Sequence, residues 1–570
     1  MNAPNRSQRA ALFVASCLVT GGLVRAHEDD LKVLHKKPAV PGSGYARGLA
    51  PGQPLPGGGL NARFTGGGVT TQALGGGTSF PAQDVTLRSW LTLGDLGGAA
   101  SGNDIWGYVS PSQREYALIG TSSGVNVVEV TNPDVPSIIA TIAGPNSLWR
   151  DIRTYQDRAY VVSEGGGGIQ VLDLSDVDNG TVLLEGAVTT GGNLASHNVS
   201  IDTVSGYLYR CGGGSDGLRI YDLANPSSPA YVATWSSRYV HDAQIVTYTS
   251  GPLAGRQLAY CCAGLNGGWT DPTLTILDVT DKQNIQLVRQ LPYPGRAYSH
   301  QGGLSEDRAL YYLGDELDEN GVISTTTHVF DVANPAAATY VGAFTNSTVA
   351  IGHNMFAAHG LLYQANYTSG LRIFDVTSNP TSPAEVAYFD TAPNSTAATF
   401  NSLWGVYPYL PSRTILCSDL ESGLFVLSYT PPVGVEFCAG NPNSTGAPAT
   451  IAGSGTPLLV DNSVQLTASN LPPFSSGYFI VSSQQGFTAS PGGSQGDLCL
   501  GGALGRYYAQ LGSSGAAGVL QLDVDAASLP QPNGTASAAV GESWSFQCWY
   551  RDANPGPTSN FSSGFVVRFQ

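Results

Sequence analysis

The sequence predicts an all-β protein in which a set of repeated sheets precedes a second β domain. The chain has 72 Gly and 35 Pro among 570 residues and only 12% charged residues, a composition that favours short strands joined by turns. A unit of roughly fifty residues recurs along its middle. The C-terminal part lacks this unit but keeps short alternating apolar runs. A chain of this length is too long for a single core.

Residues 1–26 have the pattern of a secretion signal. Arg6 and Arg9 precede an apolar stretch, and small residues end at Ala26 with the spacing that signal peptidase favours. We therefore expect cleavage near Ala26 and an extracytoplasmic protein that is secreted, periplasmic or displayed at the cell surface. An alternative interpretation is a lipoprotein signal with Cys17 as the lipidated residue, but the apolar stretch continues beyond Cys17. No other run approaches the length of a transmembrane helix.

The charge of the chain limits its partners. The sequence has 26 Lys and Arg against 42 Asp and Glu, a formal net charge of −16 that becomes −19 when the three arginines of the signal are removed. An acidic surface of this size repels nucleic acid and anionic lipid. We expect a protein, glycan or small-molecule ligand, and no nucleic-acid partner.

A flexible linker is predicted over residues 27–82. Between Pro41 and Phe80 there are 13 Gly and 4 Pro in forty residues. Such a segment buries too little apolar surface to offset the entropy lost when it is ordered. It is therefore expected to connect the signal to the first folded domain.

Residues 83–431 repeat one unit seven times. The unit is clear in EYALIGTSSGVNVVEVTNPDVPSIIATI (115–142) and in LLYQANYTSGLRIFDVTSNPTSPAEVAYF (361–389). Units of this size with four short strands are typical of propeller blades, so we predict a seven-bladed β-propeller. An acid ends the third apolar run of each copy at intervals of 44 to 56 residues, with a serine in the last: Glu129, Asp173, Asp222, Asp278, Asp331, Asp375 and Ser428.

Each unit is expected to contain four strands with distinct positions in the sheet. The first strand should line the central channel, and the acid of the third should accept backbone hydrogen bonds in the turn that follows. The seventh copy stops after its third strand, at Tyr429. VTLRSWLTL (85–93) has the pattern of the missing fourth strand. We therefore expect it to complete the last sheet and close the ring without a free edge.

Residues 437–570 are predicted to form a C-terminal antiparallel β-sandwich. Runs such as GYFIVSS and SWSFQCWY alternate as strands do. This part contains Cys438, Cys499 and Cys548. A Cys499–Cys548 disulfide is expected because both residues follow strand-like apolar runs, although spacing alone does not determine the pairing.

Four of the eight histidines occur in similar couplets at the start of an inner strand. In each, a histidine precedes a short polar residue, as in His197-Asn198 and His300-Gln301. Corresponding positions of the other copies hold tryptophan, arginine or aspartate, and loops between second and third strands add acids on the same face. The predicted site at this channel mouth comprises Trp106, Trp149, Arg150, Asp151, His197, His241, Asp242, His300, His353, Trp404, Asp315 and Glu316.

Three functions are consistent with this set of residues. The leading hypothesis is ligand binding by loops and aromatic rings on a rigid scaffold. Alternatively, His197, His241, His300 and His353 are candidate ligands of a divalent metal, which adjacent imidazoles could share. With Asp242, Asp151 or Glu316 as base, the site would then suit a metal-dependent hydrolase or lyase.

The third interpretation is structural. Each polar side chain would hold a neighbouring sheet by hydrogen bonding to its backbone, once per repeat. Residues 315–321, DELDENG, contain oxygen ligands but lack the spacing of an EF-hand, so a solvated loop is expected there.

Over about residues 83–430 the chain resembles the LVIVD-repeat proteins of the choice-of-anchor B family. The segments DIWGY, SLWRDI, YSHQGGLSEDRALYYLGDELDE and LWGVYPYLPSRTILCSDLESGLFVL follow the style of that family in order. The resemblance implies a secreted or surface-displayed bacterial β-propeller whose biochemical activity the family does not define. The C-terminal GFVVRFQ has no hydrophobic tail or sorting signal, and the last domain is similar to C-terminal modules of secreted planctomycete-like proteins.

Overall fold

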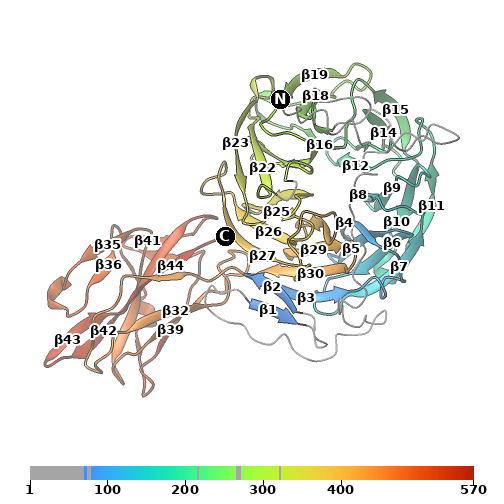
Figure 1. The fold of residues 1–570 in the computed structure, drawn as a ribbon. Helices are drawn as coiled ribbons and strands as arrows, with labels where there is room; N and C mark the ends of the chain where they lie inside the picture. The colour runs from blue at the N-terminus through green and yellow to red at the C-terminus, as the bar shows by residue number, and fades with distance from the viewer. Residues whose placement is uncertain (1–69, 74–78, 215–216, 265–270, 320–321) are drawn as a thin grey trace, which may run out of the picture.

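The computed structural model describes residues 70–73, 79–214, 217–264, 271–319 and 322–570. In this part of the chain nearly all regular structure is β, and the helical elements are single 3-10 turns. Figure 1 shows sheets arranged around a common centre, with the C-terminal strands to one side. The predicted signal segment and most of the predicted linker lie outside the described residues. No helix among the described residues is long and apolar enough to cross a membrane.

Antiparallel sheets follow one another along the chain, and in each of the first six, four consecutive strands pair in chain order. The first three sheets contain β4 (Gly102–Val109), β5 (Glu115–Thr121), β6 (Gly124–Glu129) and β7 (Ser137–Ala143); β8 (Arg150–Tyr155), β9 (Arg158–Ser163), β10 (Ile169–Asp173) and β11 (Leu183–Val188); and β12 (Asn198–Asp202), β13 (Tyr207–Cys211), β14 (Leu218–Asp222) and β15 (Ala230–Trp235).

The following sheets have the same order. They contain β16 (Asp242–Thr247), β17 (Gln257–Ala263), β18 (Thr273–Asp278) and β19 (Gln286–Leu291); β20 (Ser299–Leu304), β21 (Leu310–Asp315), β22 (Thr326–Asp331) and β23 (Thr339–Thr345); β24 (Met355–Ala358), β25 (Leu361–Ala365), β26 (Leu371–Asp375) and β27 (Ala384–Phe389); and β28 (Leu403–Tyr407), β29 (Thr414–Asp419) and β30 (Gly423–Tyr429).

The ring is closed by a strand from before the first repeat. β3 (Val85–Leu91) pairs antiparallel with β30, from Val85 opposite Tyr429 to Leu91 opposite Leu424. This confirms the prediction that residues 85–93 complete the last sheet. The first strands of neighbouring sheets contact one another in the order β4, β8, β12, β16, β20, β24 and β28, and β28 contacts β4.

The predicted linker ends earlier than expected. Within residues 70–82, β1 (Thr70–Ala73) pairs with β2 (Ser79–Gln83), and β2 pairs with β27 as a further strand of that sheet. The reason is Phe80, which is fully buried and whose ring lies 5.5 Å from Trp90 and 5.3 Å from Phe425. The burial of this aromatic side chain helps to offset the entropy lost when residues 79–83 form a strand.

Two local features recur at the outer edge of the sheets. The pairing of the third with the fourth strand is shifted by a β-bulge just before the repeated acid, for example between Ile220 and Tyr221 and between Val329 and Phe330. The acid then accepts the backbone N–H two residues later, as predicted, at Asp173, Asp222, Asp278, Asp331 and Asp375. For Glu129, the hydrogen bonds to its carboxylate come from the guanidinium of Arg114.

The C-terminal region contains two main antiparallel sheets that share a core. One contains β31 (Val435–Phe437), β44 (Gly564–Arg568), β42 (Ser543–Ala553), β34 (Ser476–Ser482) and β37 (Gly505–Arg506), and the other contains β32 (Thr450–Ser454), β33 (Gln465–Ser469) and β39 (Leu520–Asp523). Leu466 and Leu522 of the smaller sheet pack with Phe546 and Val567 of the larger. Smaller elements are β35 (Gln485–Thr488), β36 (Leu498–Leu500), β38 (Gly512–Ser513), β40 (Leu529–Gln531), β41 (Gly534–Ala536) and β43 (Pro557–Phe561).

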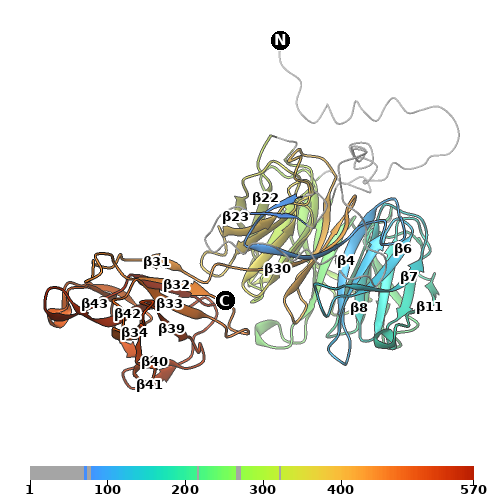
Figure 2. The ribbon, with the colours of Figure 1, turned by 90° about the horizontal axis from the view of Figure 1, so that it is seen from below.

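These C-terminal sheets lie beside the ring, away from its centre, in both ribbon views (Figures 1 and 2). Arg568 of β44 forms an ion pair with Asp375 at the end of β26 and donates to the hydroxyl of Thr377. The ends of the ring are therefore not covered by this region.

The expected Cys499–Cys548 disulfide is wrong, because the structure joins Cys438 to Cys499. Cys548 is a buried free thiol in the core between the two sheets. Its neighbour Gln547 accepts the backbone N–H of Cys499. Successive strand residues point to opposite faces, so Cys499 lies on the face of β42 that Cys548 does not reach.

The ring closure can be tested by shortening one buried side chain of β3. Replacing Leu87, which is fully buried among β3, β30 and β26 residues, by alanine should lower the free energy of unfolding by about 2–5 kcal/mol. The measurement is chemical denaturation of the full chain. Thr86→Ala, at the neighbouring and partly exposed position, is the control and should cost much less. Equal stability of the two variants would contradict closure by β3.

Peptide mapping without reduction tests the corrected cysteine pairing. We expect one cross-linked peptide pair containing Cys438 and Cys499, with Cys548 recovered as an alkylated thiol after denaturation. The Cys548→Ser variant should keep the cross-link. Recovery of a Cys499–Cys548 pair would restore the original expectation.

Candidate functional site

The predicted histidines meet at one end of the ring, where the first strands of five consecutive sheets begin. The ring centroids of His197 and His241 are 4.4 Å apart, those of His241 and His300 4.2 Å, and those of His300 and His353 4.5 Å. The indole of Trp404 continues the series, 4.2 Å from His353. These five side chains, the histidine arc, are at most 6% exposed.

Hydrogen bonds to backbone carbonyls orient two members of the arc. His241 Nδ1 donates to the carbonyl oxygen of His300, at 2.9 Å, and His353 Nδ1 donates to that of Trp404. A carbonyl oxygen can only accept, so Nδ1 carries the hydrogen in both rings and Nε2 has the lone pair of the neutral imidazole. Each bond also joins one sheet to the next, as the structural interpretation of the couplets expects.

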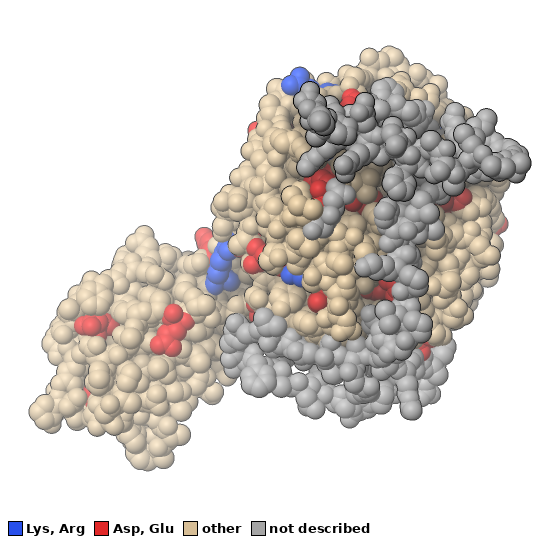
Figure 3. All heavy atoms as spheres, viewed as in Figure 1, with Lys and Arg blue, Asp and Glu red and all other residues tan. Residues whose placement is uncertain are grey.

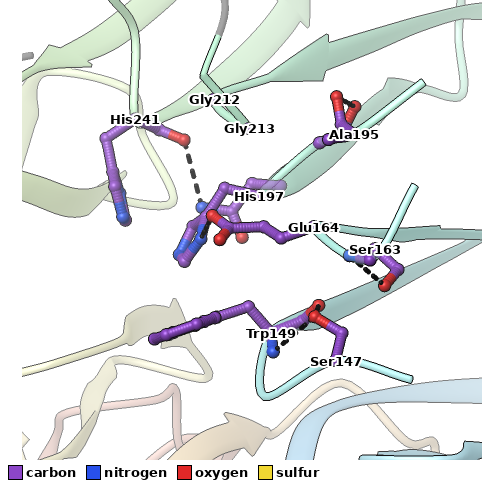
Figure 4. A network of polar contacts seen from close by, with 12 residues as sticks. Ser147, Trp149, Ser163, Glu164, Ala195, His197, Gly212, Gly213 and His241 are labelled. Carbon is purple, nitrogen blue, oxygen red and sulfur yellow. Dashed lines mark hydrogen bonds and ion pairs between the residues drawn. The ribbon is translucent and has the colours of Figure 1, made fainter. Parts of the chain in front are cut away.

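Carboxylates from the loops between second and third strands lie against the arc. Glu164 Oε1 is 2.6 Å from His197 Nδ1, and Figure 4 shows this pair beside Trp149 and His241. Glu316 lies between two imidazoles, with Oε2 3.5 Å from His300 Nε2 and Oε1 3.8 Å from His353 Nε2. His300, Glu316 and His353 are the residues of this site whose ligand atoms all lie within 4.8 Å of one another.

Asp104, Asp151 and Asp242 form a second polar layer together with Arg153. Each aspartate follows the position that corresponds, in its own sheet, to a histidine of the arc. Asp151 forms an ion pair with Arg153 and accepts the backbone N–H of Val199 in the next sheet at 2.8 Å. Asp104 Oδ2 lies 3.9 Å from Arg153 Nη1. Burial and the charge of Asp151 hold the pKa of Asp104 well above its usual range.

Asp242 belongs to the same layer and is 7% exposed. Burial raises the pKa of its carboxyl to about 6, although the charge of Arg153 acts in the opposite direction, and Asp151 adds to the increase. Its Oδ1 accepts the N–H of Ala243. The guanidinium of Arg153 therefore interacts electrostatically with three buried carboxyl groups, those of Asp104, Asp151 and Asp242.

Asp315 and Glu316 are buried, so the expectation of a solvated loop at the start of DELDENG is wrong. The carboxylate of Asp315 accepts the N–H groups of Ala297 and Tyr298 and the hydroxyl of Tyr293. These bonds hold the segment that leads into β20. Burial, together with Asp318, raises the pKa of Asp315 to about 6.

Two predicted site residues have other roles. Trp106 does not join the arc: its ring lies 4.8 Å from Tyr407 and 5.9 Å from Phe356, with the guanidinium of Arg153 4.0 Å from its centroid. It lies further along β4 than Asp104, towards the other end of the channel. Arg150 donates to the carbonyl oxygens of Thr121 and Pro145, so it holds its sheet to the preceding one.

An apolar cluster completes this end of the ring. Tyr367 and Trp404 pack with Ile351, Phe400 and Leu420, and the partly exposed Trp149 lies against them. Tyr367 also donates its hydroxyl hydrogen to Glu316 Oε1, at 2.7 Å. In the sequence, Tyr367 has no distinct signal beyond its place in a loop between second and third strands. Arg153 could have been noticed as a charge within an inner strand.

Comparison with known proteins identifies the repeat. The LVIVD repeat model matches residues 360–391, which include β25, β26 and β27. A search of curated protein sequences found no match. The repeat match and the ring of four-stranded antiparallel sheets together make the chain a β-propeller-like repeat protein.

Similar solved structures have low sequence identity. The β-propeller domain of Cps50 (Swd1) from Myceliophteria thermophila is 12% identical, and the alignment covers 57% of this chain and 96% of that one with a TM-score of 0.39. A functionally unknown protein from Desulfotomaculum acetoxidans DSM 771 is also 12% identical, covering 52% and 87%, with a TM-score of 0.36. The computationally designed Ika8 protein is 8% identical, covering 55% and 80%, with a TM-score of 0.36.

The raised pKa of Asp242 predicts a pH-dependent effect on stability. Because the folded carboxyl binds its proton more tightly than the ordinary value of 3.8 implies, the wild type should lose stability as pH rises from about 4 to about 6. Asp242→Asn removes this contribution, so the variant should gain about 2 kcal/mol relative to wild type over that interval. Thermal unfolding at several pH values provides the measurement.

The control for this experiment is Asp331→Asn, at an exposed position. Its stability relative to wild type should change much less between pH 4 and pH 6. If the difference between Asp242→Asn and wild type is constant over the interval, the carboxyl of Asp242 titrates as it would in water.

Proposed function

We propose that the chain is an extracytoplasmic seven-bladed β-propeller, followed by a β-sandwich, that binds a ligand at the end of the ring containing the histidine arc. The closed order of contacts among the inner strands, from β4 to β28 and back, supports the number of blades. The signal pattern of residues 1–26 supports the location. A disulfide between Cys438 and Cys499 also agrees with an oxidising compartment.

The observation that carries the binding function is the gathering of aromatic rings and carboxylates at one end of the scaffold. Imidazoles and an indole from five sheets lie side by side there with their planes tilted against one another, and Glu164 and Glu316 lie beside them. Trp149 contributes a partly exposed ring to the same cluster. Aromatic anchors on a rigid framework are the usual centres of recognition sites.

The chemistry favours a neutral glycan over an anionic ligand. The apolar C–H faces of sugar rings pack against indole rings such as that of the partly exposed Trp149, and a carboxylate such as that of the partly exposed Glu164 accepts sugar hydroxyl groups. The net charge of −16 opposes anions, and acidic groups are scattered over the face drawn in Figure 3. A protein or another small molecule with the same surface chemistry is the alternative ligand.

A metal-dependent hydrolase or lyase receives less support. Asp151 is bound to Arg153 and to the N–H of Val199, so it is poorly placed to act as a base. Glu316 is 1% exposed and lies between two imidazoles. A general base has to reach the proton that it removes, which these surroundings oppose.

The binding function predicts a specific effect of Trp149. An array of neutral oligosaccharides probed with the full chain should give a hit, and Trp149→Ala should weaken binding to that oligosaccharide at least tenfold, or about 1.4 kcal/mol. Isothermal titration measures the change.

The control is Trp235→Ala, which removes a partly exposed indole from the outer strand β15 and should leave the affinity unchanged. Equal losses in the two variants would contradict a site at the histidine arc. An array without any hit above background would contradict a glycan ligand.

A further inference from the structure

Two kinds of imidazole–carboxylate pair occur in the histidine arc. His197 and Glu164 are 2.6 Å apart, the distance of a hydrogen bond. The distances from Glu316 to His300 and His353, 3.5 and 3.8 Å, are longer than a hydrogen bond. Two ligands of a tetrahedral zinc ion, with bonds of 2.0–2.1 Å, are about 3.3 Å apart. The second arrangement therefore has the spacing expected of ligands around a cation.

Each of the three side chains comes from a different element. His300 lies in β20, Glu316 directly follows β21 of the same sheet, and His353 lies two residues before β24 of the next sheet. All three are nearly fully buried, with exposures of 1%, 1% and 2%. All three ligand atoms lie within 4.8 Å of one another, so binding to one ion would require them to approach to about 3.3 Å.

Hydrogen bonds already orient the groups that would face the ion. His353 Nδ1 donates to the carbonyl oxygen of Trp404, which leaves the lone pair on the Nε2 that points to Glu316. Tyr367 donates its hydroxyl hydrogen to Glu316 Oε1. Metal-binding histidines and carboxylates are typically held by second hydrogen bonds of this kind.

We infer that His300, Glu316 and His353 bind a divalent transition-metal ion, with Zn²⁺ as the representative. Two imidazole nitrogens and one carboxylate oxygen suit such an ion and are unsuited to Ca²⁺ or Mg²⁺, which prefer oxygen ligands. The ion would join the sheet of β20 to the sheet of β24. This site goes beyond ligand binding at the arc and does not depend on it.

Zinc content provides the direct test. The full-length protein is incubated with ZnCl₂, freed of loose metal by gel filtration and analysed by mass spectrometry for zinc. We expect about one zinc ion per chain, little zinc in Glu316→Gln, and wild-type zinc content in the matched variant Glu164→Gln, whose carboxylate forms the hydrogen-bonded pair. Wild-type protein without stoichiometric zinc, or zinc retained by Glu316→Gln, would overturn the assignment.

Thermal unfolding separates metal binding from a loss of folding. Added Zn²⁺ should raise the melting temperature of the wild type and of Glu164→Gln but not that of Glu316→Gln, whereas Mg²⁺ and Ca²⁺ should raise none. Tyr367→Phe should weaken the zinc affinity by roughly 10- to 100-fold, because it removes only the bond that orients Glu316. An equal response of all variants to Zn²⁺ would place the ion elsewhere. None of these measurements requires a glycan, so their outcome is separate from that of the binding experiment.

Discussion

The pairing of β3 with β30 determines where every other residue of the ring lies. It joins residues that are more than three hundred positions apart in sequence, and it gives the last sheet its fourth strand. Without it, β30 would expose an unpaired edge, and the last sheet would contact the first mainly through β28, β29 and the loop that joins them. Once the ring is closed, the inner strands must begin around one axis. The meeting of four histidines from distant parts of the chain follows from this closure.

Polar side chains near the axis then set the angle between neighbouring sheets. His241 and His353 donate to carbonyl oxygens of the next sheet, Asp151 accepts a backbone N–H, and Gln301 accepts that of Met355. Each bond forms at nearly the same place in its repeat, as expected where one structural solution is used in successive units. The structural interpretation of the couplets is thus supported for several members. It does not conflict with binding, because an imidazole that donates through Nδ1 still presents Nε2 to the channel.

Much of the ring could be predicted from sequence because its signals are local and repeated. The acid at the end of each third strand marks a turn with a fixed hydrogen bond, and this one residue gives the register of the whole unit. The predictions were wrong where the outcome depended on which face of a strand a side chain occupies, or on a single contact. The partner of Cys499 depends on which face of β42 each side chain occupies, and the strand around Phe80 depends on an aromatic pocket formed by β3 and β30. Likewise, the burial of Asp315 depends on Ala297 and Tyr298.

The two polar layers of the channel make opposite demands on stability. In the second layer, Arg153 lies near Asp104, Asp151 and Asp242, and burial together with the charge of Asp151 raises the pKa values of Asp104 and Asp242 despite this guanidinium. Uncompensated buried charge destabilises a fold. In the arc, a cation between Glu316 and its two imidazoles would offset the charge of that buried carboxylate and would also join two sheets. The proposed ion would therefore stabilise the arc, whereas the second layer depends on Arg153.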